Sequence, residues 1–306
     1  MPHAPLVIVN PTAGSGRAGR IVPWLGERLE RRADARLVIT RRAGQAEELA
    51  ATAADHGHER IVIVGGDGTV QEALNGIVAG GMAISLGIVP VGSGNDLARS
   101  LGLPRDPAEA WTVAIGEPVR AIDVARAEDG EGHTRRFASA GGIGFDAQVA
   151  AAMAMRSRWQ RGQAGYLLTT LSELRRFANR ELHLTIDGRA SSHRVLFAAI
   201  ANGEYYGGGM RIAPGAAVDD GQLDICIVGD VSRLTALRQL ANLYRGTHVR
   251  HPQVTLERGS ELSFDGDAAT RIHLDGEPWG RLPLRITVEP KRIEIAAGSP
   301  RRAAVG

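Results

Sequence analysis

Three glycine-rich turns, each placed directly after a short apolar run, constrain the fold of this chain more than any other feature. The turns are Asn10–Gly16, Gly65–Thr69 and Gly92–Asp96. Such runs are typical of buried strands, and segments with helical spacing of apolar residues separate them. Alternating strands and helices predict βαβ units and a parallel sheet. All three turns would then lie at the carboxyl edge of the sheet, where free N–H groups at helix starts bind anions.

The pattern changes at about Val119, where strands separated by turn signals such as Asp187-Gly188 predict an antiparallel β domain. The strands expected along the chain are Leu6–Val9, Arg36–Ile39, Ile61–Val64, Ile84–Val89, Val119–Ala125, Arg136–Ala140, Glu181–Ile186, Val195–Ala201, Leu223–Val228 and Leu284–Val288. The helices expected are Trp24–Arg32, Gln45–His56 and Val70–Ala79, with helical insertions around 146–177 and 232–244. We therefore expect an α/β domain over residues 1–123, to which 290–306 return, and a mainly antiparallel β domain over 124–289.

Composition narrows the classes of function. The chain has 306 residues, enough for two domains at roughly 100–200 residues each. A net charge of +2 and 4% aromatic residues argue against a nucleic-acid partner. Lys291 is the sole lysine, so a Walker-type loop is excluded. One cysteine, and no apolar run near the ~18 residues of a membrane helix, favour a cytosolic protein that is neither secreted nor membrane-spanning.

Three converging glycine loops favour a polyphosphate ligand, because glycine lets the backbone approach phosphate oxygens closely. Asp67 would repel such a ligand unless it holds Mg²⁺, orders water or takes a proton from an attacking hydroxyl. A helix cap is the structural alternative for Asp67. The segment Gly14–Gly19 also matches a dinucleotide-binding fingerprint, but no acidic residue ends the second expected strand, which runs into Thr40-Arg41-Arg42.

These motifs resemble the diacylglycerol kinase catalytic-domain family of lipid kinases, whose bacterial branch includes relatives of sphingosine kinase. The Gly65–Thr69 pattern is the most specific similarity. Further motifs follow in family order along nearly the whole chain: Asn10-Pro11, Gly92–Ala98, Gly142–Asp146, Asn202-Gly203 with Gly207–Gly209, Pro214 with Asp219–Gly221, and Asp275–Glu277.

The resemblance implies an N-terminal domain like those of NAD kinase and phosphofructokinase, a C-terminal β-sandwich, and ATP with Mg²⁺ as cofactors. The residues that it assigns to the nucleotide site are Asn10, Gly14, Thr40, Gly66, Gly68, Thr69, Gly92, Ser93 and Glu277. It implies Asp67 as the catalytic base or water relay, with Asp275 as a close rival. Asp275 could equally belong to a plain β-turn.

The resemblance also implies metal and lipid contacts. Asp96 would organise Mg²⁺, and the side chain of Asp219 or Asp220, together with the Leu223 carbonyl, would hold a second, structural magnesium. The alternative for the aspartates is an Asp-Gly turn that enters a strand. Asp146 would contact the lipid head group, or else cap a helix.

The segment Met153–Phe177 mixes arginines with apolar side chains at helical spacing. This pattern suits peripheral contact with an anionic membrane, although simple core packing explains the apolar spacing as well. The sequence thus predicts an ATP-dependent lipid kinase, most simply a diacylglycerol kinase, in the cytoplasm or peripheral to the inner face of the membrane. Two alternatives stay open: an NAD kinase-like phosphotransferase and a non-catalytic nucleotide-binding regulator. The acceptor lipid and a homodimeric state are not fixed by the sequence.

Overall fold

The computed structural model describes residues 5–30, 35–81, 83–116, 118–155 and 163–297. The chain divides into two compact units, with changeovers between Ile122 and Asp123 and again between Pro290 and Lys291. Unit 1 contains the first part of the chain together with the segment after Pro290, and unit 2 contains the residues between the two changeovers.

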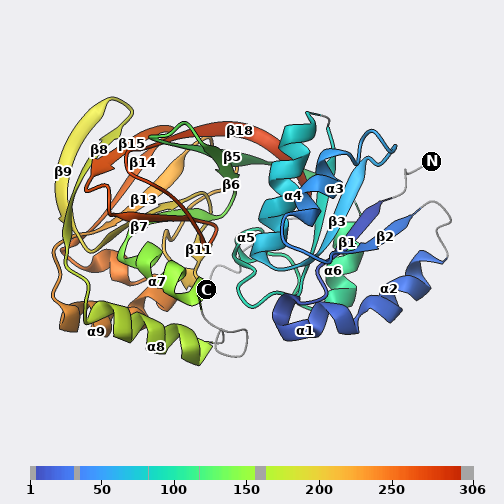
Figure 1. The fold of residues 1–306 in the computed structure, drawn as a ribbon, viewed down its shortest axis with the longest axis horizontal. Helices are drawn as coiled ribbons and strands as arrows, with labels where there is room; N and C mark the ends of the chain where they lie inside the picture. Colours follow the sequence, from blue (N-terminus) through green and yellow to red (C-terminus); the bar gives the residue numbers. More distant parts are fainter. Residues whose placement is uncertain (1–4, 31–34, 82, 117, 156–162, 298–306) are drawn as a thin grey trace. The chain divides into compact units, whose positions relative to one another are not determined.

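The core of unit 1 is a parallel sheet in the order β2–β1–β3–β4, and the end of β18 pairs in parallel beside β4 through Ile295 and Leu86 (Figure 1). These strands are β1 Leu6–Val9, β2 Arg36–Ile39, β3 Arg60–Gly65, β4 Ser85–Pro90 and β18 Leu284–Ala296. The helices are α1 Ala13–Arg20, α2 Val22–Leu29, α3 Gln45–Ala51, α4 Asp67–Gly80, α5 Asp96–Ser100 and α6 Pro107–Ala114. β1, β3 and β4 are buried over most of their length because, after Arg60 and Ser85 at the starts of β3 and β4, every residue is apolar or glycine on both faces.

The strand order reverses direction at β1, whose neighbours are β2 on one side and β3 on the other. In open α/β sheets, ligands bind at the carboxyl end of such a reversal. The loops that follow β1 and β3 are the first two glycine turns, so the topology confirms the predicted parallel sheet and places these turns at the switch point.

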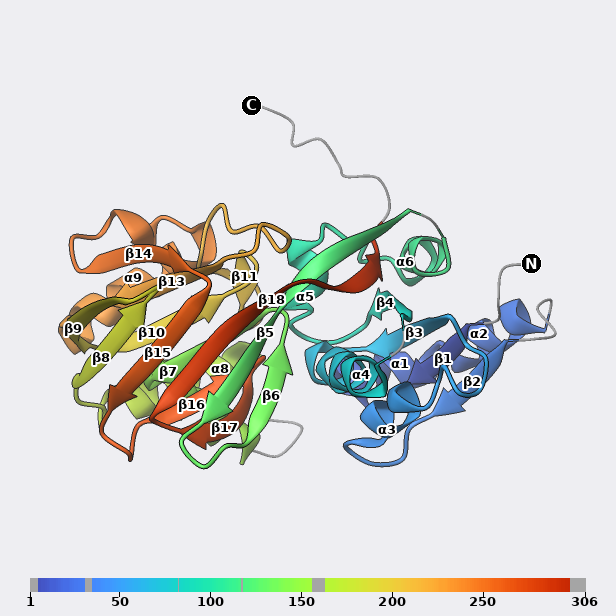
Figure 2. The same ribbon diagram turned by 90° about the horizontal axis from the view of Figure 1, so that it is seen from above.

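Unit 2 consists mainly of two antiparallel layers (Figure 2). One layer has the order β14–β13–β10–β7–β16–β17, and in the other β18 pairs with β15, β15 with β8 and β8 with β9, while β5 pairs with β18 and β6. Their bounds are β5 Val119–Asp129, β6 Thr134–Phe137, β7 Ala140–Gly144, β8 Arg180–Ile186, β9 Arg189–Val195, β10 Phe197–Ala201, β13 Leu223–Val228, β14 Val254–Gly259, β15 Glu261–Gly266, β16 Arg271–Leu274 and β17 Glu277–Arg281. A small hairpin, β11 Tyr205–Tyr206 with β12 Met210–Arg211, completes the strands of the described chain.

The core between the two layers contains Phe137, Ile143, Leu184, Phe264 and Ile286, each almost fully buried. A second apolar cluster lies on the other face of the β14–β17 layer, where three α-helices and a short 3-10 helix pack. These are α7 Phe145–Ala154, α8 Gln163–Leu174, α9 Arg233–Arg245 and the 3-10 helix η2 His248–Arg250. This arrangement confirms the mainly antiparallel β-sandwich. Among the described residues, no helix combines the length and the apolarity needed to span a bilayer.

Two expected strands were wrong. Val195–Ala201 divides at Leu196, because β9 ends at Val195 in one layer and β10 begins at Phe197 in the other. Arg136–Ala140 is not continuous, since β6 ends at Phe137 and β7 begins at Ala140. This strand is interrupted because the N–H groups of Ala138, Ser139 and Ala140 donate to the carboxylate of Asp275, which is distant in sequence, instead of forming one uninterrupted strand ladder.

Candidate functional site

Close backbone contact joins the three glycine loops of unit 1. A Cβ atom built on Gly92 would lie 2.5 Å from the Cα of Gly66, and one on Gly14 would collide with the carbonyl oxygen of Val91. Gly14 also has a φ of +59°, a conformation that favours glycine. The loops therefore pack backbone against backbone, which leaves peptide groups rather than side chains at the carboxyl edge of the sheet.

Hydrogen bonds from polar side chains fix the positions of these loops relative to one another. The Asn10 amide nitrogen donates to Thr69 Oγ1 over 3.0 Å, and Asn10 Oδ1 accepts from the Thr12 N–H and hydroxyl. Arg17 donates from Nη2 to the Gly92 carbonyl over 2.8 Å and from Nε to the Gly14 carbonyl. Arg17 was not predicted, although its position inside the first glycine motif was a usable signal.

Asp67 is the first residue of α4, and its carboxylate bridges to the third loop. One oxygen accepts from the N–H of Asn95 and the other from the N–H of Asp96, both over 2.6 Å. Asp67 therefore accepts from N–H groups at the start of α5. The predicted alternative was a cap of α4, the helix that Asp67 itself begins, so the capping role is present but serves a different helix. Burial raises the pKa of the Asp67 carboxyl, against the N–H donors of Asp96 and Asn95, which lower it.

The other predicted nucleotide residues of unit 1 lie in or beside these loops. Thr40 directly follows β2 and is buried, with its hydroxyl donating to the Val9 carbonyl. Gly68 lies in the first turn of α4, Ser93 is exposed in the third loop, and Asp96 is buried at the start of α5. The edge is thus an assembly of N–H groups, hydroxyls and two carboxylates, which suits a phosphate chain and an accompanying cation.

Asp275 lies in the turn between β16 and β17, with a φ of +48°. Its carboxylate accepts from the N–H groups of Ser139 and Ala140, each over 3.0 Å, and more weakly from Ala138. Asp275 therefore does more than form a β-turn, because it determines where β7 begins. Glu277, two residues later, is exposed at the start of β17.

Asp146, in the first turn of α7, is buried against His273 on β16. The Asp146 Oδ2 to His273 Nε2 distance is 3.2 Å, and Asp146 Oδ1 accepts from the Ala147 N–H. Because the Gly276 N–H donates to His273 Nδ1, the ring proton is assigned to Nε2, which donates to Asp146. The close approach requires Gly142, since a Cβ there would overlap the Asp146 carboxylate. His273 was missed, although it stands two residues before Asp275.

The aspartates proposed for a structural metal lie at the entry to β13. Asp220 pairs with Arg258 and accepts from the Gln222 N–H, while Arg258 also contacts Asp224 over 3.2 Å. Within the part of the chain that the structure describes, no three His, Cys, Asp or Glu side chains are grouped to hold a metal. Magnesium at Asp219, Asp220 and Leu223 therefore stays a prediction.

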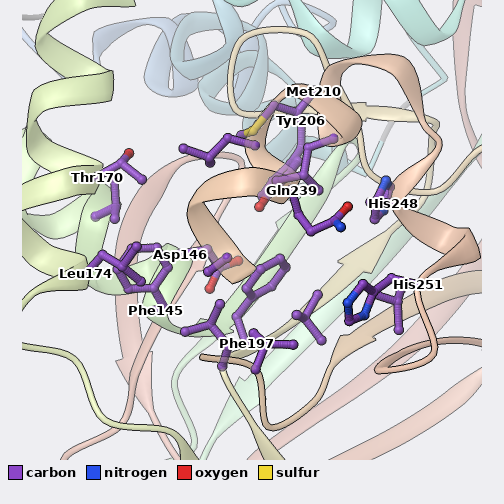
Figure 3. Close-up of a pocket in the computed structure, with 18 residues that line it drawn as sticks. Phe145, Asp146, Thr170, Leu174, Phe197, Tyr206, Met210, Gln239, His248 and His251 are labelled. Atoms are coloured by element: carbon purple, nitrogen blue, oxygen red, sulfur yellow. The ribbon is translucent and has the colours of Figure 1, made fainter. Parts of the chain in front are cut away.

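An apolar pocket in unit 2 lies between the helices and the β14–β17 layer (Figure 3). It encloses about 700 Å³ of space not filled by protein atoms, part of it open to solvent. Apolar side chains dominate its wall, and the few polar groups include Asp146, Gln239 and His248. Burial lowers the pKa of His248, so its ring is neutral at neutral pH. This composition is typical of a site for a largely apolar ligand.

The pocket walls also decide part of the membrane prediction for Met153–Phe177. Leu174 and Phe177 are buried, as the core-packing alternative requires, whereas Met155 and Leu168 are exposed. Several residues of the segment lie outside the described part of the chain: Arg156, Arg158, Trp159 and Arg161. The α9 side of the pocket was not predicted as a ligand wall, because helical spacing alone does not separate core from cavity.

Comparison with known proteins agrees with both units. Residues 4–127 match the diacylglycerol kinase catalytic domain, and residues 139–297 match the YegS C-terminal NAD kinase beta sandwich-like domain. A diacylglycerol kinase of Mycobacterium tuberculosis is 32% identical over 291 residues, covering 94% of this chain and 93% of that protein. That of Bacillus subtilis is 26% identical over 279 residues, with 90% of each covered.

Solved structures show the same fold. The crystal structure of a diacylglycerol kinase from Bacillus anthracis aligns with a TM-score of 0.71 at 24% identity over 96% of each chain. A second structure from that organism aligns with a TM-score of 0.78 at 26% identity. With its glycine-loop edge, its two-layered second unit and family matches across both, this chain belongs to the diacylglycerol kinase family of lipid kinases.

Proposed function

We propose that this kinase transfers the γ-phosphoryl group of ATP to the free hydroxyl of a diacylglycerol. The observation that carries the proposal is the carboxyl edge of unit 1, where Gly66 and Gly92 bring two loops into backbone contact beside Asp67. An edge built from peptide groups can donate several hydrogen bonds to phosphate oxygens without a lysine. The only lysine of the chain, Lys291, lies in β18 and not in these loops.

The nucleotide would lie against the loops that follow β1, β3 and β4, with Asn10, Thr69 and Ser93 adding polar groups. The buried carboxylate of Asp96 fits a hard cation, for which Mg²⁺ is the family's choice. When bound, that ion neutralises negative charge on the phosphates. Glu277 of unit 2 remains a proposed nucleotide contact.

Asp67 is the proposed base or water relay. Burial raises the pKa of its carboxyl, which brings its proton affinity closer to that needed for catalysis at neutral pH. The two N–H donors fix the carboxylate in place, and each oxygen retains a further lone pair for a hydroxyl or a water. Asp275 stays the rival, and its carboxylate is held in the same way by three N–H groups.

The acyl chains of the acceptor would occupy the apolar pocket of unit 2. Burying them there removes apolar surface from water, at roughly 25 cal/mol per Å². The Asp146–His273 pair supplies the polar contact for the glycerol end of the lipid. We further propose a cytoplasmic enzyme that acts at the inner face of the membrane, with exposed Leu168 and Met155 among its contacts; a homodimer remains a prediction.

Transfer of radiolabel from γ-labelled ATP tests the proposal. Purified protein is incubated with Mg²⁺ and dispersed diacylglycerol, and in parallel with NAD⁺ as acceptor. We expect label in an organic-extractable product, absent with Asp67→Asn. Label on NAD⁺ alone would establish the NAD kinase-like alternative, and nucleotide binding without transfer to either acceptor would establish the regulator.

A further inference from the structure

Helix α9 has two apolar faces, only one of which is buried. Ala236, Leu240 and Leu243 line the pocket of unit 2. On the adjoining side of the helix, Leu234, Leu237 and Tyr244 are 55%, 41% and 47% exposed. At 3.6 residues per turn, these three residues and Ala241 fall on one face. Three large apolar side chains on one outward face differ from single exposed residues, which need no explanation.

From α9 as far as Leu256, every acidic or basic side chain other than histidine is an arginine. Asp230, just before this stretch, is exposed and pairs with Arg194. The sequence between Val231 and Leu256 contains no aspartate or glutamate, but has four arginines: Arg233, Arg238, Arg245 and Arg250. Arg233 donates to the Phe177 carbonyl and so anchors the start of the helix near the end of α8. Arg238 and Arg245 are exposed and lie together along one edge of the apolar face, beside Leu234. An exposed apolar stripe bordered by arginine and free of acidic residues is the pattern of a helix that lies on an anionic bilayer.

We propose that the outer face of α9 docks on the surface of an anionic phospholipid membrane, an inference that rests on the proposed lipid kinase function. Leu234, Leu237 and Tyr244 enter the boundary between head groups and acyl chains, while Arg238 and Arg245 contact lipid phosphates. Because the other face of the same helix forms a wall of the pocket, docking brings the proposed acyl-chain site within one helix diameter of the bilayer. The acceptor lipid would therefore have a short path out of the membrane.

Charge distinguishes this occupant from a second copy of the chain. A twofold interface built on α9 would bring together two copies of a helix that carries arginines and no acidic residue, so neither copy would offer an opposite charge to the other. The phosphates of an anionic membrane attract the arginines, and its acyl chains provide an apolar environment for the leucines.

Vesicle co-sedimentation tests the docking directly. The probes are phosphatidylcholine vesicles with and without phosphatidylglycerol. Arg238→Gln with Arg245→Gln should lower the partition coefficient by about fivefold per arginine on the anionic vesicles only. Leu234→Ser with Leu237→Ser should lower it by about tenfold or more on anionic vesicles, because two apolar side chains lose their burial. The matched controls are Arg189→Gln and Leu256→Ser, which alter an exposed arginine and an exposed leucine on strands of unit 2.

Depth in the bilayer provides a second readout. Cys226 is buried, and burial raises the pKa of its thiol to about 12, so a new surface cysteine can be labelled selectively. Leu237→Cys carrying a polarity-sensitive fluorophore should shift to the blue on anionic vesicles, and the same label on Leu256→Cys should not. Equal shifts at both positions would overturn the assignment of α9.

Activity separates failure of this inference from failure of the proposed function. All α9 variants should phosphorylate a water-soluble, short-chain diacylglycerol at the wild-type rate, and lose rate only on vesicle-borne substrate. If the wild type phosphorylates neither, the lipid kinase proposal fails. If the wild type is active on both and the α9 variants bind vesicles as it does, the docking surface is refuted while the function stands. A wild-type dimer that Leu237→Ser converts to monomer, with vesicle binding unchanged, would assign the face to self-association instead.

Discussion

The two candidate binding regions of this protein differ in the groups that form them: backbone peptide groups in unit 1 and apolar side chains in unit 2. The edge of unit 1 is made of backbone, in which glycines permit contacts such as that between Gly66 and Gly92, and hydrogen bonds fix every loop. The pocket of unit 2 is made of apolar side chains on helices and strands. A phosphate chain has fixed geometry and needs aligned donors, whereas acyl chains need only volume and apolar surface. Under the proposed division of roles, a change of acceptor would require repacking of unit 2 alone, while unit 1 stays the same.

Asp67→Asn should cause the largest effect if the loop edge is the catalytic region. Loss of a positioned base lowers kcat by roughly 10²–10⁴-fold. The amide keeps one acceptor for the Asn95 or Asp96 N–H, so the fold should persist. Steady-state kinetics with diacylglycerol measure the loss of kcat, and circular dichroism checks that the variant is folded. A kcat within a few-fold of wild type would transfer the role of base to Asp275.

The pH dependence sharpens the same test. Because the pKa of Asp67 is raised in the folded protein, its carboxyl protonates at higher pH than a free aspartate, whose pKa is about 3.9. Activity that needs the ionised form should therefore fall on the acidic side, above the range of ordinary aspartates. The effect of pH on the free energy of unfolding is opposite to that of a salt-bridged acid. The contribution of Asp67 to stability falls as pH rises from the pKa of the unfolded carboxyl to the higher pKa of the folded one. An acid limb unchanged in the residual activity of Asp67→Asn would assign it to another group.

Gly66→Val should weaken ATP binding next most strongly. The φ of Gly66 is −113°, so a side chain is conformationally allowed and only space forbids it, since its Cβ would lie 3.0 Å from Gly92 Cα. A valine side chain there would force the two loops apart and displace their N–H groups, so we expect nucleotide affinity measured by calorimetry to fall about tenfold or more, which is about 1.4 kcal/mol of binding free energy. Gly26→Val is the matched control, because Gly26 lies in α2 outside the glycine loops and nothing lies within 4 Å of its Cβ. Wild-type affinity in Gly66→Val would contradict the loop edge as the ATP site.

Leu240→Trp tests whether the apolar pocket of unit 2 holds the acyl chains of the acceptor. The larger ring would occupy pocket space in unit 2, so kcat/KM should fall about tenfold for long-chain diacylglycerol and little for a short-chain one. The KM for ATP should not change, because no loop of unit 1 is altered. Equal losses for both acceptors would show that the pocket does not hold the acyl chains.

Asp187→Asn should give the smallest effect and contrasts with Asp67. Asp187, in the turn from β8 to β9, also accepts from two backbone N–H groups, those of Ser260 and Glu261, but it is exposed. These bonds lower the pKa of Asp187, whereas burial raises that of Asp67. The stability from Asp187 is present above the pKa of the unfolded carboxyl and lost as pH falls through the folded one.

We expect the substitution to cost about 1 kcal/mol at neutral pH and less in acid, because solvent screens an exposed carboxylate. Asparagine also tolerates the φ of +46° at this position, so the change isolates the charge. Urea unfolding at two pH values measures the difference. A cost that is the same in acid would show that the charge of Asp187 contributes nothing.

Periodicity was sufficient for the parallel sheet of unit 1, because β1, β3 and β4 are short apolar runs bounded by glycine turns. It failed where distant polar groups decide local structure. The gap between β6 and β7 depends on Asp275, more than a hundred residues away in sequence. Arg17 and His273 were missed for the same reason, since their hydrogen-bond partners are set by tertiary packing. The glycine motifs located the candidate site, whereas the roles of Asp67 and Asp275 depend on contacts that no spacing encodes.

The return of the chain into unit 1 through β18 has a consequence for biosynthesis. Ile293 and Ile295 are buried, and Ile295 pairs beside Leu86 of β4, so the first unit acquires its last strand only after the whole of unit 2 has left the ribosome. Domains made from one continuous stretch can fold as they emerge. Here the nascent loop edge must wait with one side of β4 uncovered, which makes unit 1 the later of the two units to complete its fold.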